Sequence, residues 1–100
     1  MDTLTDTLAT VLGGYAGHDL NGDSFLTQSS DRAVMTVISV GDVRGQHFAV
    51  TNLVAHIADG RIVIEHDIHD KPLVDALVDA GVSRQRIVLA YAGESGSHAA

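Results

Sequence analysis

The chain has 100 residues, of which 45% are hydrophobic, and thirteen acidic against six basic residues give it a formal net charge of −7. This length predicts a single domain, which we place at residues 1–92, and the lack of cysteine excludes disulfides and thiolate metal sites. The acidic balance argues against direct nucleic-acid binding, which uses clustered Lys and Arg, and favours a basic protein partner.

Hydropathy adds two expectations about the surroundings of the protein. No apolar stretch reaches the length of a membrane span, and residues 1–5 lack the basic start of a signal peptide, so we expect a cytoplasmic protein without membrane contact. The apolar fraction is high for so small a domain. We therefore expect a homo-oligomer, a dimer or higher, in which another subunit covers part of the apolar surface.

A helix is predicted at the N-terminus. Thr3 is a candidate cap, Gly13 and Gly14 end the pattern, and apolar residues recur at helical spacing. These residues are Leu4, Leu8, Val11, Leu12 and Tyr15.

The middle of the chain is rich in β-strand signals. A turn-rich segment at 17–24 leads into a short strand at 25–28, and longer strands are predicted at 33–40 and 46–57. Asp59 and Gly60 then predict a tight hairpin turn, because both residue types tolerate a positive φ. The next strand covers 61–66, with Ile62 and Ile64 on one face.

A second helix is predicted after this sheet. Asp70 is a candidate N-cap or near-cap, Pro72 lies near the first turn, and Gly81 suits a left-handed C-terminal position. A last strand follows at 87–91, and residues 93–100 read as a flexible tail. The fold class is therefore α+β: an N-terminal helix, an antiparallel sheet of four to five strands, and one further helix before the last strand.

Strands 33–57 carry apolar residues at both alternating sets of positions, which predicts a sheet with both faces covered. The two helices can cover one face, so a second subunit is expected on the other. The interface residues predicted for that subunit contact are Phe48, Val50, His56, Val63 and Glu65.

Two segments could bind a metal ion. Residues 19–23 begin like a calcium loop, but Ser24 and Ser30 stand where that loop needs Gly and a carboxylate, so a polar turn is the better interpretation. His66 and His69 could share a metal only in a helix or tight turn, and exposed polar residues are the preferred interpretation there. We predict no metal and no cofactor.

Catalytic patterns are weak. The chain has no Gly-x-Ser-x-Gly elbow, and Gly93 to Gly96 follows the last strand without a helix that could bind an anion. His56 is expected to be a hydrogen-bonded core or interface histidine. We therefore predict that the protein is not an enzyme.

The second half of the chain resembles the XisI-like family. Three runs carry the resemblance: DGRIVIE at 59–65, LVDAGV at 77–82 and IVLAY at 87–91. They are similar to the family patterns DGKIWIQ and ELVxxGVPKEDIVLGF at the same spacing. The chain departs from the family at four places: Val63 replaces a Trp, His56 an Asp, Ser83 a Pro, and Ala92 with Gly93 a His-Pro-Pro-like end.

The resemblance implies an accessory factor that controls excision of the fdxN element, usually encoded beside XisH, a nuclease-like protein. No catalytic residue carries over from it. The resulting hypothesis is a non-catalytic regulatory protein that binds a XisH-like partner in control of DNA rearrangement. The alternative is a small-ligand or metal-binding domain on the same fold.

Overall fold

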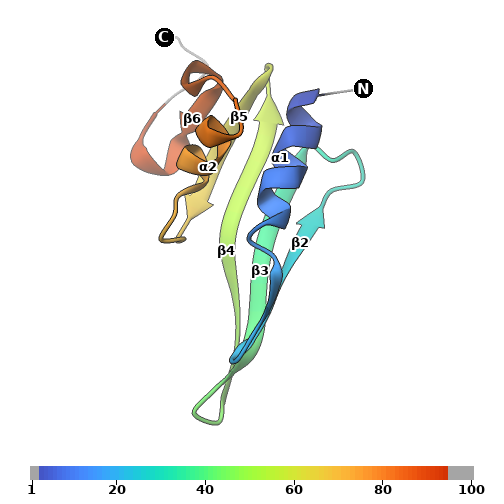
Figure 1. Cartoon of the computed structure of the whole chain (residues 1–100), viewed down its shortest axis with the longest axis vertical. Coiled ribbons are helices and arrows are strands. Elements are labelled where there is room, and N and C mark those ends of the chain that lie inside the picture. Colours follow the sequence, from blue (N-terminus) through green and yellow to red (C-terminus); the bar gives the residue numbers. More distant parts are fainter. Residues whose placement is uncertain (1–2, 95–100) are drawn as a thin grey trace.

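A computed structural model describes residues 3–94 of the chain. An N-terminal helix precedes a β-rich middle, and a second helix precedes the last strand, so the structure confirms the α+β class (Figure 1). The elements in chain order are α1 (Thr3–Gly13), β1 (Gly17–Asp19), β2 (Gly22–Gln28), β3 (Val34–Val43), β4 (Gln46–Ala58), β5 (Arg61–Asp67), α2 (Leu73–Asp79), the 3-10 turn η1 (Arg84–Arg86), β6 (Ile87–Leu89) and η2 (Ala90–Ala92).

The six strands form one sheet in sequence order, β1-β2-β3-β4-β5-β6. This is one strand more than predicted, because the segment expected to be a turn contains β1, whose three residues pair with Gly22 to Ser24. The prediction of an antiparallel sheet holds for β1 to β5 but is wrong for β6, which runs parallel to β5. The crossover through α2 returns the chain to the starting end of β5, and such a crossover joins parallel strands.

Two tight turns set the register of the long hairpins. Asp59 and Gly60 have φ of 53° and 73°, which confirms the predicted turn between β4 and β5. Arg44 and Gly45 have φ of 53° and 77° and make an equivalent turn between β3 and β4. Each turn is only two residues long, so β3, β4 and β5 follow one another along the chain and lie next to one another in the sheet.

The second helix ends as its sequence predicts and begins differently. Gly81 has φ of 100°, and the amides of Gly81 and Val82 donate to the carbonyls of Val78 and Leu77, so a Schellman motif closes α2. The prediction of Asp70 as N-cap is wrong, because Pro72 occupies that position.

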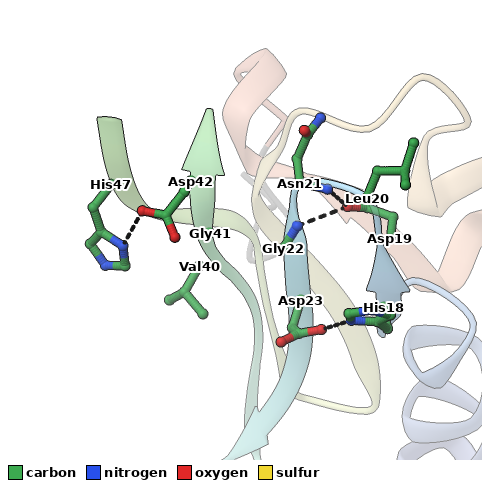
Figure 2. Close-up of a pocket in the computed structure, with 10 residues that line it drawn as sticks. All are labelled: His18, Asp19, Leu20, Asn21, Gly22, Asp23, Val40, Gly41, Asp42 and His47. Carbon is green, nitrogen blue, oxygen red and sulfur yellow. Dashed lines mark hydrogen bonds and ion pairs between the residues drawn. The ribbon is translucent and has the colours of Figure 1, made fainter. Parts of the chain in front are cut away.

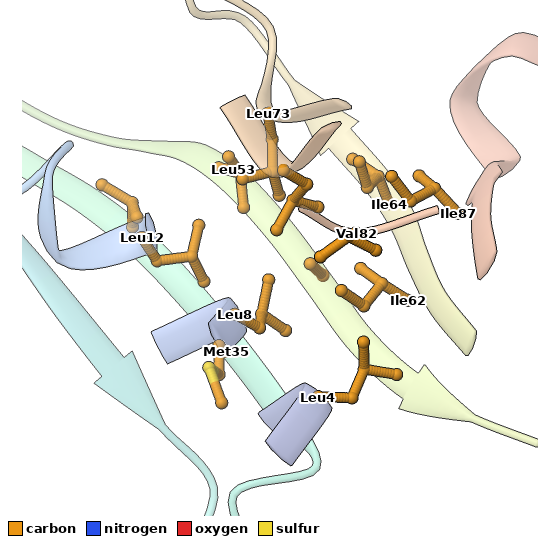
Figure 3. Packing of buried hydrophobic residues seen from close by; sticks show 13 residues of the cluster. Leu4, Leu8, Leu12, Met35, Leu53, Ile62, Ile64, Leu73, Val82 and Ile87 are labelled. Atoms are coloured by element: carbon orange, nitrogen blue, oxygen red, sulfur yellow. The ribbon is translucent and has the colours of Figure 1, made fainter. Parts of the chain in front are cut away.

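Both helices lie on the same face of the sheet, and the core fills the space between (Figures 1 and 3). The stripe of α1 predicted from sequence supplies three core residues, Leu4, Leu8 and Leu12. The sheet and α2 contribute the fully buried side chains Met35, Val37, Leu53, Ala55, Ile62, Ile64, Leu73 and Leu77. Within residues 3–94, neither helix combines the length and apolar character needed to cross a bilayer.

The paired strands continue beyond the helices as a projection that we call the arm, residues 17–24 and 39–50 (Figure 1). It contributes to an elongated shape with principal extents of 48 × 30 × 26 Å. The arm has no helix against either face in Figure 1, so its side chains are largely exposed.

The first residues of the predicted tail are held against the domain. The Glu94 carboxylate accepts the Leu89 amide hydrogen at 2.8 Å and pairs with the Arg84 guanidinium at 3.0 Å. These contacts lower the pKa of the Glu94 carboxyl group, with the Leu89 amide the larger cause. The remainder of that prediction, residues 95–100, lies outside the described residues.

Candidate interaction surfaces

Asp19 closes the turn between β1 and β2. Its Oδ1 accepts the amide hydrogens of Asn21 at 2.9 Å and Gly22 at 3.1 Å, as an Asx turn does. The carboxylate that opens the candidate calcium loop therefore satisfies backbone donors of its own turn. This geometry favours the polar-turn interpretation of residues 19–23.

A shallow open hollow of about 880 Å³ lies on the arm (Figure 2). Two His–Asp pairs border it: His18 with Asp23, and His47 with Asp42 at 3.3 Å. The hydrogen bond to Asp23 and the charge of that carboxylate raise the pKa of His18. Leu20 beside them is fully exposed, so the arm presents both acidic and apolar groups to solvent.

The backbones of β2 and β3 approach very closely at the floor of this hollow. Gly22 pairs with Gly41, and a Cβ built on Gly41 would lie 2.0 Å from the Asn21 carbonyl oxygen and 2.8 Å from the Gly22 Cα. No side chain fits there without a backbone shift. Both glycines are therefore required by this pairing, which fixes how the arm leaves the sheet.

The two candidate metal ligands after β5 point to different partners. The His66 ring contacts the Thr51 carbonyl oxygen at 3.1 Å, whereas the His69 ring pairs with Asp67 at 2.9 Å. The structure does not bring the two imidazoles together. Across residues 3–94, no group of three or more His, Asp or Glu side chains is arranged to hold a metal ion.

The Asp67 carboxylate organises the segment that enters α2, a role that the sequence analysis missed. Its side chain is 1% exposed and accepts the amide hydrogens of His69 at 3.0 Å and Leu73 at 2.6 Å. Asp67 thus accepts a hydrogen bond from the first backbone amide of α2, as an N-cap side chain does, although it lies six residues before the helix. The only signal in the sequence is an acidic residue at the end of a strand shortly before a helix.

Tyr15 completes this cluster from the end of α1. Its ring lies against the His69 imidazole with centroids 4.2 Å apart, and its hydroxyl donates to the Lys71 carbonyl oxygen at 2.8 Å. Burial raises the pKa of Tyr15, and the nearby charges of Asp67 and Asp75 raise it further. These contacts tie α1 to the loop before α2.

The predicted interface residues divide between two faces of the sheet. His56 and Glu65 pair at 2.8 Å on the face opposite the helices, and Val63 is the cross-strand neighbour of His56. Phe48 and Val50 pair with Gly41 and Ser39, which share the helix side of β3 with buried Val37. The five residues therefore do not form one surface.

We call the part of the opposite face over β2 to β5 the outer patch. His56 lies between Val34 and Val63, its cross-strand neighbours on β3 and β5. By strand pairing and alternation the outer patch consists of Phe25, Thr27, Val34, Thr36, Ile38, Thr51, Val54, His56, Val63 and His66, together with Glu65 at the register shift of β5.

Comparison with known proteins gives a family for this fold. A family model described as XisI protein matches residues 3–99. The chain belongs to the XisI family. The match extends beyond the second half of the chain, which carries the resemblance seen in the sequence, and so covers both the arm and the helices. No curated protein matches the chain.

Two solved structures share the fold of this XisI chain. A XisI-like protein from Anabaena variabilis is 22% identical, with a TM-score of 0.65 and coverage of 96% of this chain and 82% of the other. The fdxN element excision controlling factor XisI from Anabaena variabilis is 20% identical, with a TM-score of 0.65 and coverage of 95% of this chain and 89% of the other.

Two departures of this XisI chain from the family pattern lie side by side. His56 and Val63, which stand where the pattern has Asp and Trp, are directly paired between β4 and β5 in the outer patch. Two of the four departures therefore lie in the patch, as an imidazole beside a small aliphatic side chain.

Proposed function

We propose that this XisI-family protein is an accessory factor in the control of DNA element excision and acts through protein contact rather than catalysis. The observation that carries the proposal is the XisI match over residues 3–99. It is supported by the shared fold with a protein named as the fdxN element excision controlling factor XisI.

The hydrogen bonds of two acidic side chains support a non-catalytic role. Asp19 accepts backbone amide hydrogens in the β1–β2 turn of the arm, and Asp67 accepts the Leu73 amide hydrogen at the start of α2. A carboxylate that caps backbone amides is fixed as an acceptor and is poorly placed to exchange protons with a substrate. The hydrogen bonds of Asp19 and Asp67 thus have structural explanations.

The partner that we propose is a XisH-like, nuclease-type protein in the cytoplasm, with a basic contact surface. A formal net charge of −7 on 100 residues attracts a basic protein and speeds its association. The same charge disfavours contact with DNA phosphates, so we assign DNA contact to the partner.

Co-expression with a XisH-like protein tests this proposal. We expect the tagged chain to retain the partner through purification at about 0.1 M salt and to lose much of it near about 1 M, where screening shortens the Debye length from about 10 Å to about 3 Å. A folded pair that never associates at low salt would contradict the proposal. Substrate turnover by the purified chain alone would contradict its non-catalytic part.

A small-ligand or metal-binding role is the second candidate, and the hollow on the arm is the observation that favours it. Calorimetry with calcium, zinc and nickel distinguishes metal binding from the accessory role. Stoichiometric heat with a micromolar Kd, abolished by Asp42→Asn, would favour metal binding; absence of heat would favour the accessory role.

A further inference from the structure

The outer patch is an unusually apolar surface for a chain of this charge. Phe25 is 47% exposed and Val34 is 43% exposed, although both lie in strands. The two helices lie against the other face of the sheet (Figure 1). Solvent-exposed apolar side chains grouped in this way are typical of an interaction site.

The charges of the patch are already paired within it. Its ionisable side chains are Glu65, His56 and His66: Glu65 lies 2.8 Å from His56, and the His66 ring contacts the Thr51 carbonyl oxygen at 3.1 Å. Its threonines Thr27 and Thr36 are hydrogen-bonded to each other. A surface with one acid and one imidazole side by side is complementary to itself after a two-fold rotation, because each group can meet its opposite in the other copy.

The rest of the molecule repels a second copy. Exposed carboxylates occur on α2 at Asp75 and Asp79 and on the arm at Asp19 and Asp42. Two chains with a formal charge of −7 approach most easily through a region without excess negative charge. We propose that a second copy of this chain seats on the outer patch, forming a two-fold dimer with the sheets face to face.

The size of the patch sets the strength of this dimer. Four strands have three gaps of about 4.8 Å, and five β3 residues have four steps of about 3.4 Å, so both sides measure about 14 Å between backbone atoms. Two such patches bury less than the about 1,600 Å² of a standard interface, so the dimer belongs to the weak, concentration-dependent class.

Sedimentation equilibrium of the chain alone, from about 1 μM to about 1 mM, tests the proposal. We expect the mass to rise from 10.5 kDa toward twice that value. Val34→Glu should raise the dimer Kd at least about tenfold, because it places an unpaired carboxylate in the apolar contact. A wild-type protein that stays monomeric throughout would overturn the proposal.

A matched control comes from α2. Val78 is 43% exposed, as Val34 is, so Val78→Glu adds the same charge on the opposite face and should leave the dimer Kd unchanged. Dissociation by Val78→Glu and not by Val34→Glu would place the contact on the helices and contradict us.

Dilution of the wild-type protein gives a readout that needs no variant. Over the same concentration range, the amide chemical shifts of Val34, His56 and Val63 should move while those of α2 stay constant. Shifts confined to α2 would overturn the proposal. Because the dimer is measured without a partner, its failure and the failure of the XisH-like complex are separate results.

Discussion

Asp67 is the residue on which the start of α2 depends. Its buried carboxylate accepts two backbone amide hydrogens, from His69 and Leu73. Asp67→Ala leaves these donors without their acceptor, and we expect a loss of about 2 to 3 kcal/mol in the free energy of unfolding. Urea denaturation measures this as a lower midpoint with an unchanged m-value.

A surface carboxylate provides the comparison. Asp79 pairs with Lys71 at 3.0 Å, and both side chains are more than 60% exposed. Asp79→Ala should therefore change stability by no more than about 0.5 kcal/mol. Equal effects of the two substitutions would show that Asp67 is not the structural acceptor described above.

His18 should titrate above its ordinary pKa of 6.5, because the hydrogen bond and charge of Asp23 favour the imidazolium. A raised pKa in the folded state stabilises the β1–β2 hairpin below pH 6.5, and this contribution is lost as pH rises through the folded value. NMR titration should show the His18 pKa falling in Asp23→Asn and unchanged in Asp79→Asn. A wild-type pKa at or below 6.5 would contradict the pairing.

The cluster around Asp67 shows why residue roles are hard to predict from sequence. Tyr15 and Asp67 are separated by 52 positions, and the Tyr15 ring reaches Asp67 only through His69. Local patterns identified the C-terminal end of α2 through Gly81, which acts on its own backbone, but not its N-cap, which is Pro72. They could not identify an acceptor that the end of β5 supplies through a bend in the chain.

At the scale of elements, the pairing of β2 with β3 depends on Gly22 and Gly41. A methyl group on Gly41 would meet the Asn21 carbonyl carbon at 2.9 Å and its oxygen at 2.0 Å, so the strands must separate. We expect Gly41→Ala to lower stability by about 1 to 3 kcal/mol, as overpacking does. Hydrogen exchange should become faster at Asp42, whose amide bonds to the Asn21 carbonyl at 2.9 Å.

Gly13 is the control for that substitution. It lies at the end of α1, and a Cβ there would have no atom within 4 Å. Gly13→Ala should be neutral or stabilise by up to about 1 kcal/mol, because alanine favours the helix. Unchanged exchange at Asp42 in Gly41→Ala would contradict the close approach of the two strands.

Most helices, strands and turns could be predicted from the sequence. Which face of the sheet each strand residue occupies could not. Positive φ at Asp59 and the C-terminal position of Gly81 follow from residue type, so the β4–β5 hairpin and the end of α2 were predicted correctly. The register shift between Val37 and Ile38 has no such signature. It inserts a residue into β4 and moves Phe48 and Val50 to the face opposite His56, which divides the predicted interface.

At the scale of the whole molecule, the charge predicts that this protein does not bind DNA by itself. Its Lys and Arg residues number six and are spread over the chain as Arg32, Arg44, Arg61, Lys71, Arg84 and Arg86. An excess of seven negative charges repels phosphates over a Debye length of about 8 Å at physiological salt. DNA association should therefore require the basic partner.

Fluorescence anisotropy of a labelled duplex at physiological salt tests the accessory role most directly. The chain alone should leave the anisotropy unchanged. With a XisH-like protein bound to the duplex, adding the chain should change the anisotropy, because the chain contacts the protein and not the phosphates. Sub-micromolar binding of the duplex by the chain alone, or no response in the presence of the partner, would contradict the account.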